Sequence, residues 1–149
     1  MDVCTLCRPY DDQNLTRIRL ETDAFYLILQ HIQNGPYTMI VSPIHFREVA
    51  VIEETRERAE VTALVHRYPT SLSSDLSSVR KRAEALHARR FGVAGAAYVT
   101  FAEATADMFI TCADRLFRQR RRASVRMRAM TLSIFVWQRI CDETESIFE

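Results

Sequence analysis

Apolar residues recur along the chain first with helical spacing and then with strand spacing. Five of them stand three, four and seven residues apart between positions 17 and 33: Ile18, Phe25, Ile28, Leu29 and Ile32. This spacing predicts an amphipathic helix, which Asn34 and Gly35 end. The β-prone run at 37–41 predicts a short strand. A second helix is expected to begin near Pro43, because proline suits a first turn, and to continue through residues 54–66.

The same alternation continues through the second half of the chain. Residues 68–72 predict a weak strand or a loop, and Ser73 or Ser74 is expected to cap a helix that runs toward Phe91 and stops at Gly92. The remaining expected elements are a helix at 94–104, a strand at 108–111, a basic helix at 115–122, a strand at 125–129 and a final helix at 133–146. Strands that alternate with long helices predict an α/β fold, with three α/β/α layers and a central parallel sheet.

Length and composition fit one ordinary globular domain. The chain has 149 residues, of which 48% are hydrophobic and 26% charged, so residues 1–149 are expected to form a single core. No apolar run approaches the roughly 20 residues of a membrane span. The start of the chain lacks the basic head and apolar stretch of a signal peptide, so we expect a cytoplasmic protein without a membrane partner.

The positive charge is almost entirely arginine and is concentrated near the end of the chain. Lys81 is the one lysine among 20 basic residues, and seven arginines lie between positions 115 and 128. Arginine binds phosphate through its planar fork. The cluster therefore predicts an RNA-binding surface, with a solvated helix face as the alternative; its candidate residues are Arg118, Arg120, Arg121 and Arg122.

Cysteines suggest a second kind of chemistry. Cys4 and Cys7 form a C-x-x-C pair, which together with Cys112 could bind zinc or take part in redox reactions. A structural zinc site needs a second closely spaced ligand pair, and the histidines at 31, 45, 66 and 87 do not supply one. The simpler interpretation is reduced, partly buried thiols in a reducing compartment.

Acidic residues stand where predicted strands give way to helices. Asp2 precedes the first helical segment, Glu48 lies on the helix after the strand at 37–41, and Asp114 follows the strand at 108–111. Ligands of parallel α/β sheets bind beyond the carboxyl ends of the strands, so these three side chains are expected to gather there. Carboxylates suit Mg²⁺ or Mn²⁺, which can activate water for phosphodiester cleavage. Asp114 could also cap the following helix, while Asp11 and Asp12 favour turn roles.

Three segments together resemble one protein family. The start reads D-V-C-T-L-C-R-P-Y-D-D-Q, residues 42–48 read S-P-I-H-F-R-E, and residues 109–117 read F-I-T-C-A-D-R-L-F. These segments resemble motifs of bacterial PIN-domain proteins of the VapC-like kind, the toxins of type II toxin-antitoxin pairs. The resemblance covers nearly the whole chain. It assigns Asp2 and Glu48 to the first and second acidic positions of the family.

The resemblance implies a PIN fold and a defined activity. Members cleave single-stranded RNA as Mg²⁺- or Mn²⁺-dependent endoribonucleases, often form homodimers and are neutralised by an antitoxin protein. On this basis Asp2, Glu48 and Asp114 are the expected catalytic and metal-binding residues.

The sequence also departs from the family pattern. The third acidic position has no aspartate at Gly95 or Ala96, Tyr98 stands where the family has histidine, and the fourth acidic position is Ala113. Only Met1 precedes Asp2, where the family has a complete strand, so the first strand is expected to be truncated. These departures leave an alternative of a different class, a catalytically inactive PIN-like module that binds RNA or an antitoxin-like partner.

Overall fold

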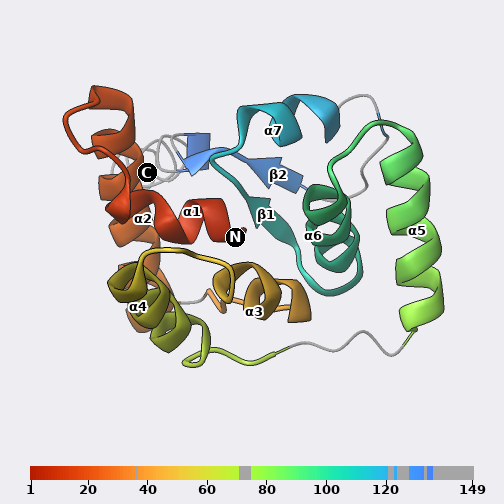
Figure 1. Cartoon of the computed structure of the whole chain (residues 1–149), viewed down its shortest axis with the longest axis horizontal. Helices are drawn as coiled ribbons and strands as arrows, with labels where there is room; N and C mark the ends of the chain where they lie inside the picture. Colours follow the sequence, from red (N-terminus) through yellow and green to blue (C-terminus); the bar gives the residue numbers. More distant parts are fainter. Residues whose placement is uncertain (36, 71–74, 121–122, 124–127, 133, 136–149) are drawn as a thin grey trace, which may run out of the picture.

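The computed structural model describes residues 1–35, 37–70, 75–120, 123, 128–132 and 134–135, and within them helices predominate (Figure 1). In chain order the elements are α1 (Val3–Cys7), η1 (Arg8–Tyr10), α2 (Thr16–Asn34), α3 (Pro43–Val49), α4 (Thr55–Val65), α5 (Leu76–Ala88), α6 (Val93–Thr105), β1 (Met108–Ile110), α7 (Asp114–Arg120) and β2 (Arg128–Met130). The short helix η1 is a 3₁₀ helix.

A small parallel sheet makes the chain α/β rather than all-helical. Strands β1 and β2 pair in parallel, with Met108 opposite Arg128 and Ile110 opposite Met130. A separate parallel bridge joins Val41 to Thr70. Parallel strands require a crossover connection, and α7 lies in the segment that connects β1 to β2.

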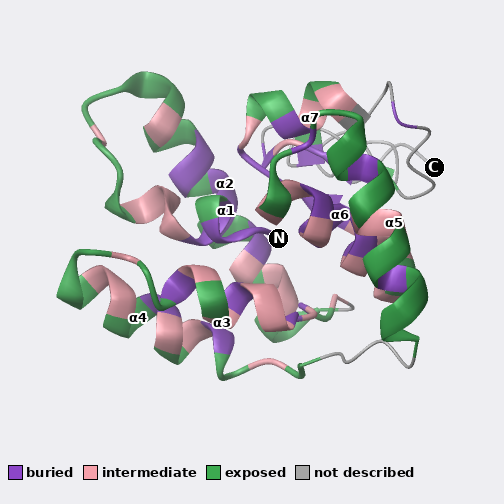
Figure 2. Cartoon of the chain, turned by 45° about the vertical axis from the view of Figure 1, so that its right-hand side comes forward, coloured by how far each residue is buried: buried purple, intermediate pink, exposed green. Residues whose placement is uncertain are grey.

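Helices surround this sheet on several sides. In Figure 1, α6 and α5 lie to one side of β1, and α1, α2 and α4 lie to the other. Valine, leucine, isoleucine and aromatic side chains from these helices and both strands form one buried cluster. Figure 2 shows buried and half-buried segments toward the middle of the molecule and exposed segments on the outer faces of helices such as α5.

The helix expected at 17–33 and the helix expected at 94–104 are confirmed. They correspond to α2 and α6, and Asn34 ends α2 as predicted. The predicted start at Pro43 is also confirmed, because Ser42 and the side chain of His45 form a capping box at the first turn of α3. The predicted continuation into residues 54–66 is wrong, because α3 ends at Val49 and Glu54 caps the separate helix α4.

The strand expected at 37–41 is reduced to one bridged residue. Val41 donates its amide hydrogen to the carbonyl of Pro69, 3.1 Å away, and pairs with Thr70. Residues 37–40 therefore belong to no assigned strand. Thr70 supplies the bridging residue of the weak strand expected at 68–72, whose last two positions lie outside the described residues.

Two other boundaries differ from the sequence-based expectation. Asp75, not Ser73 or Ser74, caps α5, because its carboxylate accepts hydrogen bonds from the amides of Ser77 and Ser78. The helix stops before Gly92, since Arg90 has a φ of 69°. Gly92 instead stands before the first turn of α6.

The end of the chain is described only in part. The strand expected at 125–129 appears as β2 (Arg128–Met130), and residues 125–127 of the expected strand lie outside the described residues. The final helix expected at 133–146 lies almost wholly outside them. Among the described helices, none combines the length and apolarity needed to cross a bilayer.

Candidate functional site

Asp2 is a buried carboxylate held by neutral donors. It is 3% exposed and stands at the N-cap of α1, where its Oδ1 accepts hydrogen bonds from the amide (3.0 Å) and hydroxyl (2.7 Å) of Thr5. Its Oδ2 accepts the hydroxyl hydrogen of Thr111 at 2.5 Å. No arginine or lysine is among these partners, so the hydrogen bonds orient the side chain without cancelling its charge.

Thr5 and Thr111 join the beginning of the chain to the end of β1. The amide of Cys112 donates to Oγ1 of Thr5 at 3.2 Å, and the amide of Ala113 donates to Oγ1 of Thr111 at 3.0 Å. The amide of Thr111 in turn bonds the carbonyl of Met130. The carboxylate of Asp2 is thereby fixed at the carboxyl end of β1, the sheet edge at which the sequence predicts a ligand site.

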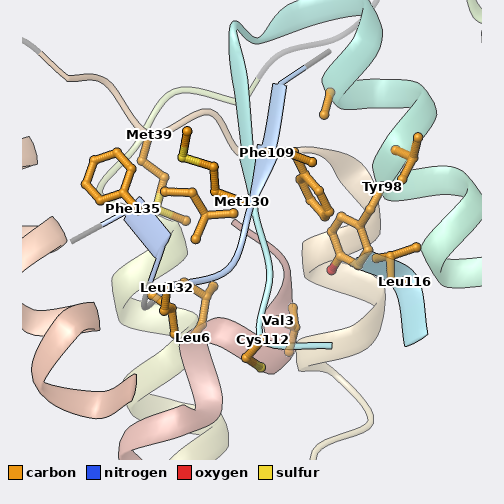
Figure 3. Close-up of a cluster of buried hydrophobic side chains, with 14 of the residues drawn as sticks. Val3, Leu6, Met39, Tyr98, Phe109, Cys112, Leu116, Met130, Leu132 and Phe135 are labelled. Atoms are coloured by element: carbon orange, nitrogen blue, oxygen red, sulfur yellow. The ribbon is translucent and has the colours of Figure 1, made fainter. Parts of the chain in front are cut away.

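Glu48 lies on α3 beside the same region. Burial, followed by the neighbouring carboxylate of Glu48, raises the pKa of the Tyr98 hydroxyl, and Asp2 acts in the same direction. That hydroxyl is buried and makes no hydrogen bond of good geometry within the described part of the chain. Figure 3 shows Tyr98 with its oxygen toward Val3, next to the start of α1. Tyr98 is 4% exposed, as expected of a core residue.

The pKa of Cys4 is also affected by both carboxylates. A hydrogen bond to Cys112 lowers the pKa of the Cys4 thiol, while burial and the charges of Asp2 and Glu48 oppose this change. The same bond and burial raise the pKa of Cys112. The charges of Asp2 and Glu48 thus both raise the pKa of Tyr98 and both oppose the lowering of the Cys4 pKa.

Asp114 has a different environment. Its two carboxylate oxygens accept hydrogen bonds from the two terminal nitrogens of Arg17, each at 2.7 Å, and this guanidinium lowers the pKa of the Asp114 carboxyl. Arg17 also pairs with the buried Glu21 at 2.9 Å, and Arg8 approaches the other oxygen of Glu21 at 2.9 Å. Asp114 is the first residue of α7 rather than its N-cap.

Residues 8–13, which comprise η1 and the turn after it, are held by contacts with one another. Arg8 pairs with Asp11 at 2.7 Å, and the side-chain amide of Gln13 donates to the carbonyl oxygens of Arg8 and Asp11. Oδ1 of Asp12 accepts the amide hydrogen of Asn14, as in an Asx-turn. The turn role predicted for Asp12 is confirmed, and Asp11 is the C-cap residue of η1, whose amide donates to the carbonyl of Arg8.

Two of the three predicted metal ligands, Asp2 and Glu48, remain candidates at this edge. Within the described part of the chain, no three histidine, cysteine or acidic side chains are grouped as a metal ion would need. Mg²⁺ can be held by one or two carboxylates while it keeps several waters. The donor chemistry of Asp2 and Glu48 fits this smaller requirement, and Asp114 as placed is occupied by Arg17.

The cysteine pair does not converge on one point. The thiol of Cys4 shares a hydrogen bond with Cys112, whereas burial and a hydrogen bond to Glu57 raise the pKa of Cys7. Cys4, Cys7 and Cys112 are free thiols. Cys4 and Cys7 therefore contact different residues and do not act as a pair of ligands.

The predicted arginine surface is described only at its beginning. Arg118 is exposed on α7 and lowers the pKa of Asp114 together with the nearer Arg17. Arg120 closes α7. Arg121 and Arg122 lie outside the described residues.

Three residues at the site had no functional role in the sequence analysis. They are Thr5, Thr111 and His45. The ring of neutral His45 accepts from Ser42 at Nδ1 and donates from Nε2 to the carbonyl oxygen of Met1 at 2.8 Å. The sequence S-P-I-H contains the capping-box spacing that could have revealed His45.

The chain was compared with known protein families, curated proteins and solved structures. No protein family model, no curated protein and no solved structure matches the chain.

Proposed function

We propose that the chain is a PIN-like, divalent-metal-dependent endoribonuclease that cleaves single-stranded RNA as the toxin of a toxin-antitoxin pair in the cytoplasm. The observation that carries this proposal is the buried carboxylate of Asp2, oriented by Thr5 and Thr111 at the carboxyl end of β1. Its charge is left uncompensated by any described cation within hydrogen-bond distance. The three-layer PIN-like sheet, the antitoxin and the homodimer belong to the same proposal.

Each residue would have a distinct task. Asp2 and Glu48 would hold the metal, and Thr5 and Thr111 would keep Asp2 in one orientation. A bound Mg²⁺ or Mn²⁺ supplies an activated water and neutralises charge on the phosphodiester. Asp114 is the third candidate carboxylate and joins the site when Arg17 releases it. Arg118 and the following arginines would bind RNA phosphates.

RNA cleavage by the purified chain tests this assignment. We expect Mn²⁺-dependent cleavage of an end-labelled single-stranded RNA, reduced about 100-fold by Glu48→Gln or Asp2→Asn, because removing one group that orients a metal ligand or stabilises charge in the transition state commonly costs about 10- to 1,000-fold. Glu53→Gln is the matched control, since Glu53 is exposed in the loop before α4. Cleavage that persists at full rate in both site variants would overturn the assignment.

Metal affinity provides a second measurement that does not depend on activity. Calorimetric titration with MnCl₂ should show weaker binding to Asp2→Asn and to Glu48→Gln than to the unmodified chain and Glu53→Gln. Equal affinity in all four proteins would place the ion elsewhere.

A second candidate function is supported by Arg17. Its two bonds to Asp114 neutralise one of the three expected acids, which suits a PIN-like module that binds RNA or an antitoxin-like protein without cutting. This candidate predicts retention of labelled single-stranded RNA in a gel-shift assay with no cleavage at any Mn²⁺ or Mg²⁺ concentration. Cleavage abolished by Glu48→Gln would exclude it.

A further inference from the structure

The guanidinium of Arg17 binds two carboxylates that differ in their exposure. Its Nε donates to Glu21 at 2.9 Å, and its two terminal nitrogens donate to the two oxygens of Asp114 at 2.7 Å each. Glu21 has 3% of its side chain exposed, whereas Asp114 has 47% exposed. Arg17 is therefore held on its inner side by a buried acid, and its two terminal nitrogens, which form the Arg17 fork, meet an acid at the surface.

Glu21 is a fixed anchor for this guanidinium. The second carboxylate oxygen of Glu21 lies 2.9 Å from Nε of Arg8, so each oxygen pairs with a different arginine. A buried carboxylate is costly unless it is paired, and the two guanidinium groups supply that pairing. Arg17 and Glu21 also stand four residues apart on α2, the spacing at which helical side chains meet. The position of the Arg17 fork is thus determined by the interior of the protein and not by Asp114 alone.

The bidentate pair of Arg82 and Glu103 is built differently. Arg82 donates from Nε and one terminal nitrogen to Glu103, whose side chain is 10% exposed. This contact joins α5 to α6 and has a structural role. In Arg17 the inner nitrogen makes the structural contact, which leaves both terminal nitrogens for a partner at the surface.

Positive charge converges on the exposed carboxylate of Asp114. Asp114 begins α7, the helix that follows β1, so the Arg17 fork lies beyond the carboxyl end of this strand. The charges of Arg118 and Arg8 also act on Asp114. Three arginines, from α2, α7 and η1, therefore act on one acid at the sheet edge where ligands of parallel α/β folds bind.

We propose that the Arg17 fork is a binding site for the phosphate group of a nucleotide, and that Asp114 occupies the place of the phosphate when none is bound. A guanidinium binds phosphate with the same two parallel hydrogen bonds that it makes to a carboxylate. Asp114 can exchange with such a ligand, because an exposed ion pair contributes little to stability. The site goes beyond the proposed ribonuclease activity, since phosphate binding here needs neither a metal ion nor cleavage.

A terminal phosphate fits this place better than a carboxylate does. A carboxylate has two oxygens, and the Arg17 fork occupies both. A phosphate monoester has three oxygens and a charge of about −1.5 to −2 at neutral pH. The additional charge would be met by Arg118 and Arg8. An internal phosphodiester carries a single charge and would depend mainly on the fork.

Nuclear magnetic resonance titration with inorganic phosphate tests the site. The Nε–H signal of Arg17 is identified by its absence from Arg17→Lys. At constant ionic strength and without divalent metal, this signal should shift saturably with phosphate, and Asp114→Asn should bind phosphate about fivefold more tightly. Loss of the competing ion pair accounts for about a factor of two, and removal of the like charge for the rest. An affinity unchanged by Asp114→Asn would overturn the proposal.

The double variant Asp114→Asn/Arg17→Lys separates the fork from its charge. Lysine keeps the positive charge but cannot form two parallel hydrogen bonds. We therefore expect phosphate binding at least tenfold weaker than in Asp114→Asn, measured on the backbone amide signals of α2 and α7. Unchanged circular dichroism checks the fold of both proteins. Equal phosphate affinity would overturn the proposal, because any cation at this position would then suffice.

Glu60→Gln is the matched control. It removes the exposed acid that pairs with Arg56 on α4, whose side chain is 81% exposed. The described contacts of Arg56 include no buried carboxylate, so its release should create no phosphate site. Phosphate binding to Glu60→Gln as tight as to Asp114→Asn would show that any released arginine binds phosphate, and would overturn the proposal.

Nucleotides distinguish the two sources of such a phosphate. Uridine 5′-monophosphate carries a monoester, the dinucleotide UpU carries an internal diester, and uridine carries neither. We expect the monophosphate to bind Asp114→Asn about threefold more tightly than UpU, and uridine to leave the Arg17 signal unshifted. Tighter binding of UpU would keep the phosphate site and assign it to the interior of an RNA chain. Equal binding of all three would overturn the proposal. These titrations contain no divalent metal, so their failure is distinct from a failure of the cleavage assay.

Discussion

The two acidic residues on either side of β1's carboxyl end are held in opposite ways. Asp2 is 3% exposed and its described hydrogen-bond partners are threonine hydroxyls and one backbone amide. Asp114 has 47% of its side chain exposed and both oxygens bonded to a guanidinium. Both are aspartates at the start of a helix, Asp2 as the N-cap of α1 and Asp114 as the first residue of α7.

This difference shows that the partner of a carboxylate, more than its position, decides what it can bind. Neutral donors leave the negative charge of Asp2 available to a cation. A bidentate arginine satisfies the charge and the lone pairs of Asp114 together. A metal ion at this edge would therefore meet Asp2 and Glu48 first and would have to compete with Arg17 for Asp114.

Asp2→Ala should have the largest effect on stability. It removes the N-cap of α1 and leaves two buried hydroxyls without their acceptor, so we expect the free energy of unfolding to fall by about 3 kcal/mol. Urea denaturation measures the change. Asp12→Ala is the control, because Asp12 makes an exposed turn contact and its loss should cost about 0.5 kcal/mol. Similar losses in the two variants would mean that Asp2 is not structurally anchored.

Thr111→Val should cost about 2 kcal/mol. The change keeps the side-chain shape but removes the donor to Asp2 and the acceptor for the amide of Ala113. The matched control is Thr100→Val, since Thr100 is similarly buried and its hydroxyl donates to the carbonyl of Ala96 within its own helix. Such a bond adds little stability, so the control should change by about 0.5 kcal/mol or less. Equal effects would remove any special role for the Asp2–Thr111 link.

The helices could be predicted because their signal is local. The apolar spacing within 17–33 and the small residues of 94–104 determine which face packs inward, and α2 and α6 match both. The strand at 37–41 could not be predicted in the same way. A strand requires a partner, and among the described residues Val41 pairs only with Thr70, while residues 37–40 before it line a cavity beside β1.

The site shows the same division between local and distant information. Asp2, Glu48 and Asp114 were identified from their places beside predicted helices and from the family resemblance, and their metal-binding role remains a prediction. The hydrogen bond from Thr111 to Asp2 spans 109 residues, and the bonds from Arg17 to Asp114 span 97. Those partners depend on how the elements pack, which spacing along one chain does not record.

Protonation of His45, which bonds the carbonyl of Met1 next to Asp2, should make the stability of the fold depend on pH. Burial lowers the pKa of His45 below its ordinary value of about 6.5, so the folded protein holds the ring neutral while the unfolded chain protonates it first. The stabilisation is complete above that ordinary value and is lost as the pH falls below it.

Urea denaturation at pH 7.5, 6.5 and 5.5 measures this dependence. His45→Gln should flatten the decrease, whereas His66→Gln, at an exposed histidine, should retain it. A decrease of unchanged size in His45→Gln would assign the pH dependence to other groups.

The ion pair between Arg17 and Asp114 should have the smallest effect. Its side chains are 57% and 47% exposed, and exposed pairs typically contribute 0.2–1 kcal/mol, so a double-mutant cycle of Arg17→Gln and Asp114→Asn should give a coupling of about 0.5 kcal/mol. The cycle is needed because Arg17 also pairs with Glu21. The exposed pair Arg56–Glu60, four residues apart on α4, provides the control cycle. The Arg17–Asp114 coupling should fall in 1 M NaCl.

The size of the Arg17–Asp114 coupling decides whether Asp114 differs from Asp2 in its availability to a metal ion. A coupling of about 0.5 kcal/mol means that a competing cation can detach Asp114 from Arg17 at a cost of only about a factor of two in affinity. Asp114 would then be available as a third carboxylate. A coupling above about 3 kcal/mol would lower that affinity more than a hundredfold and leave Asp2 and Glu48 as the carboxylates open to a metal ion.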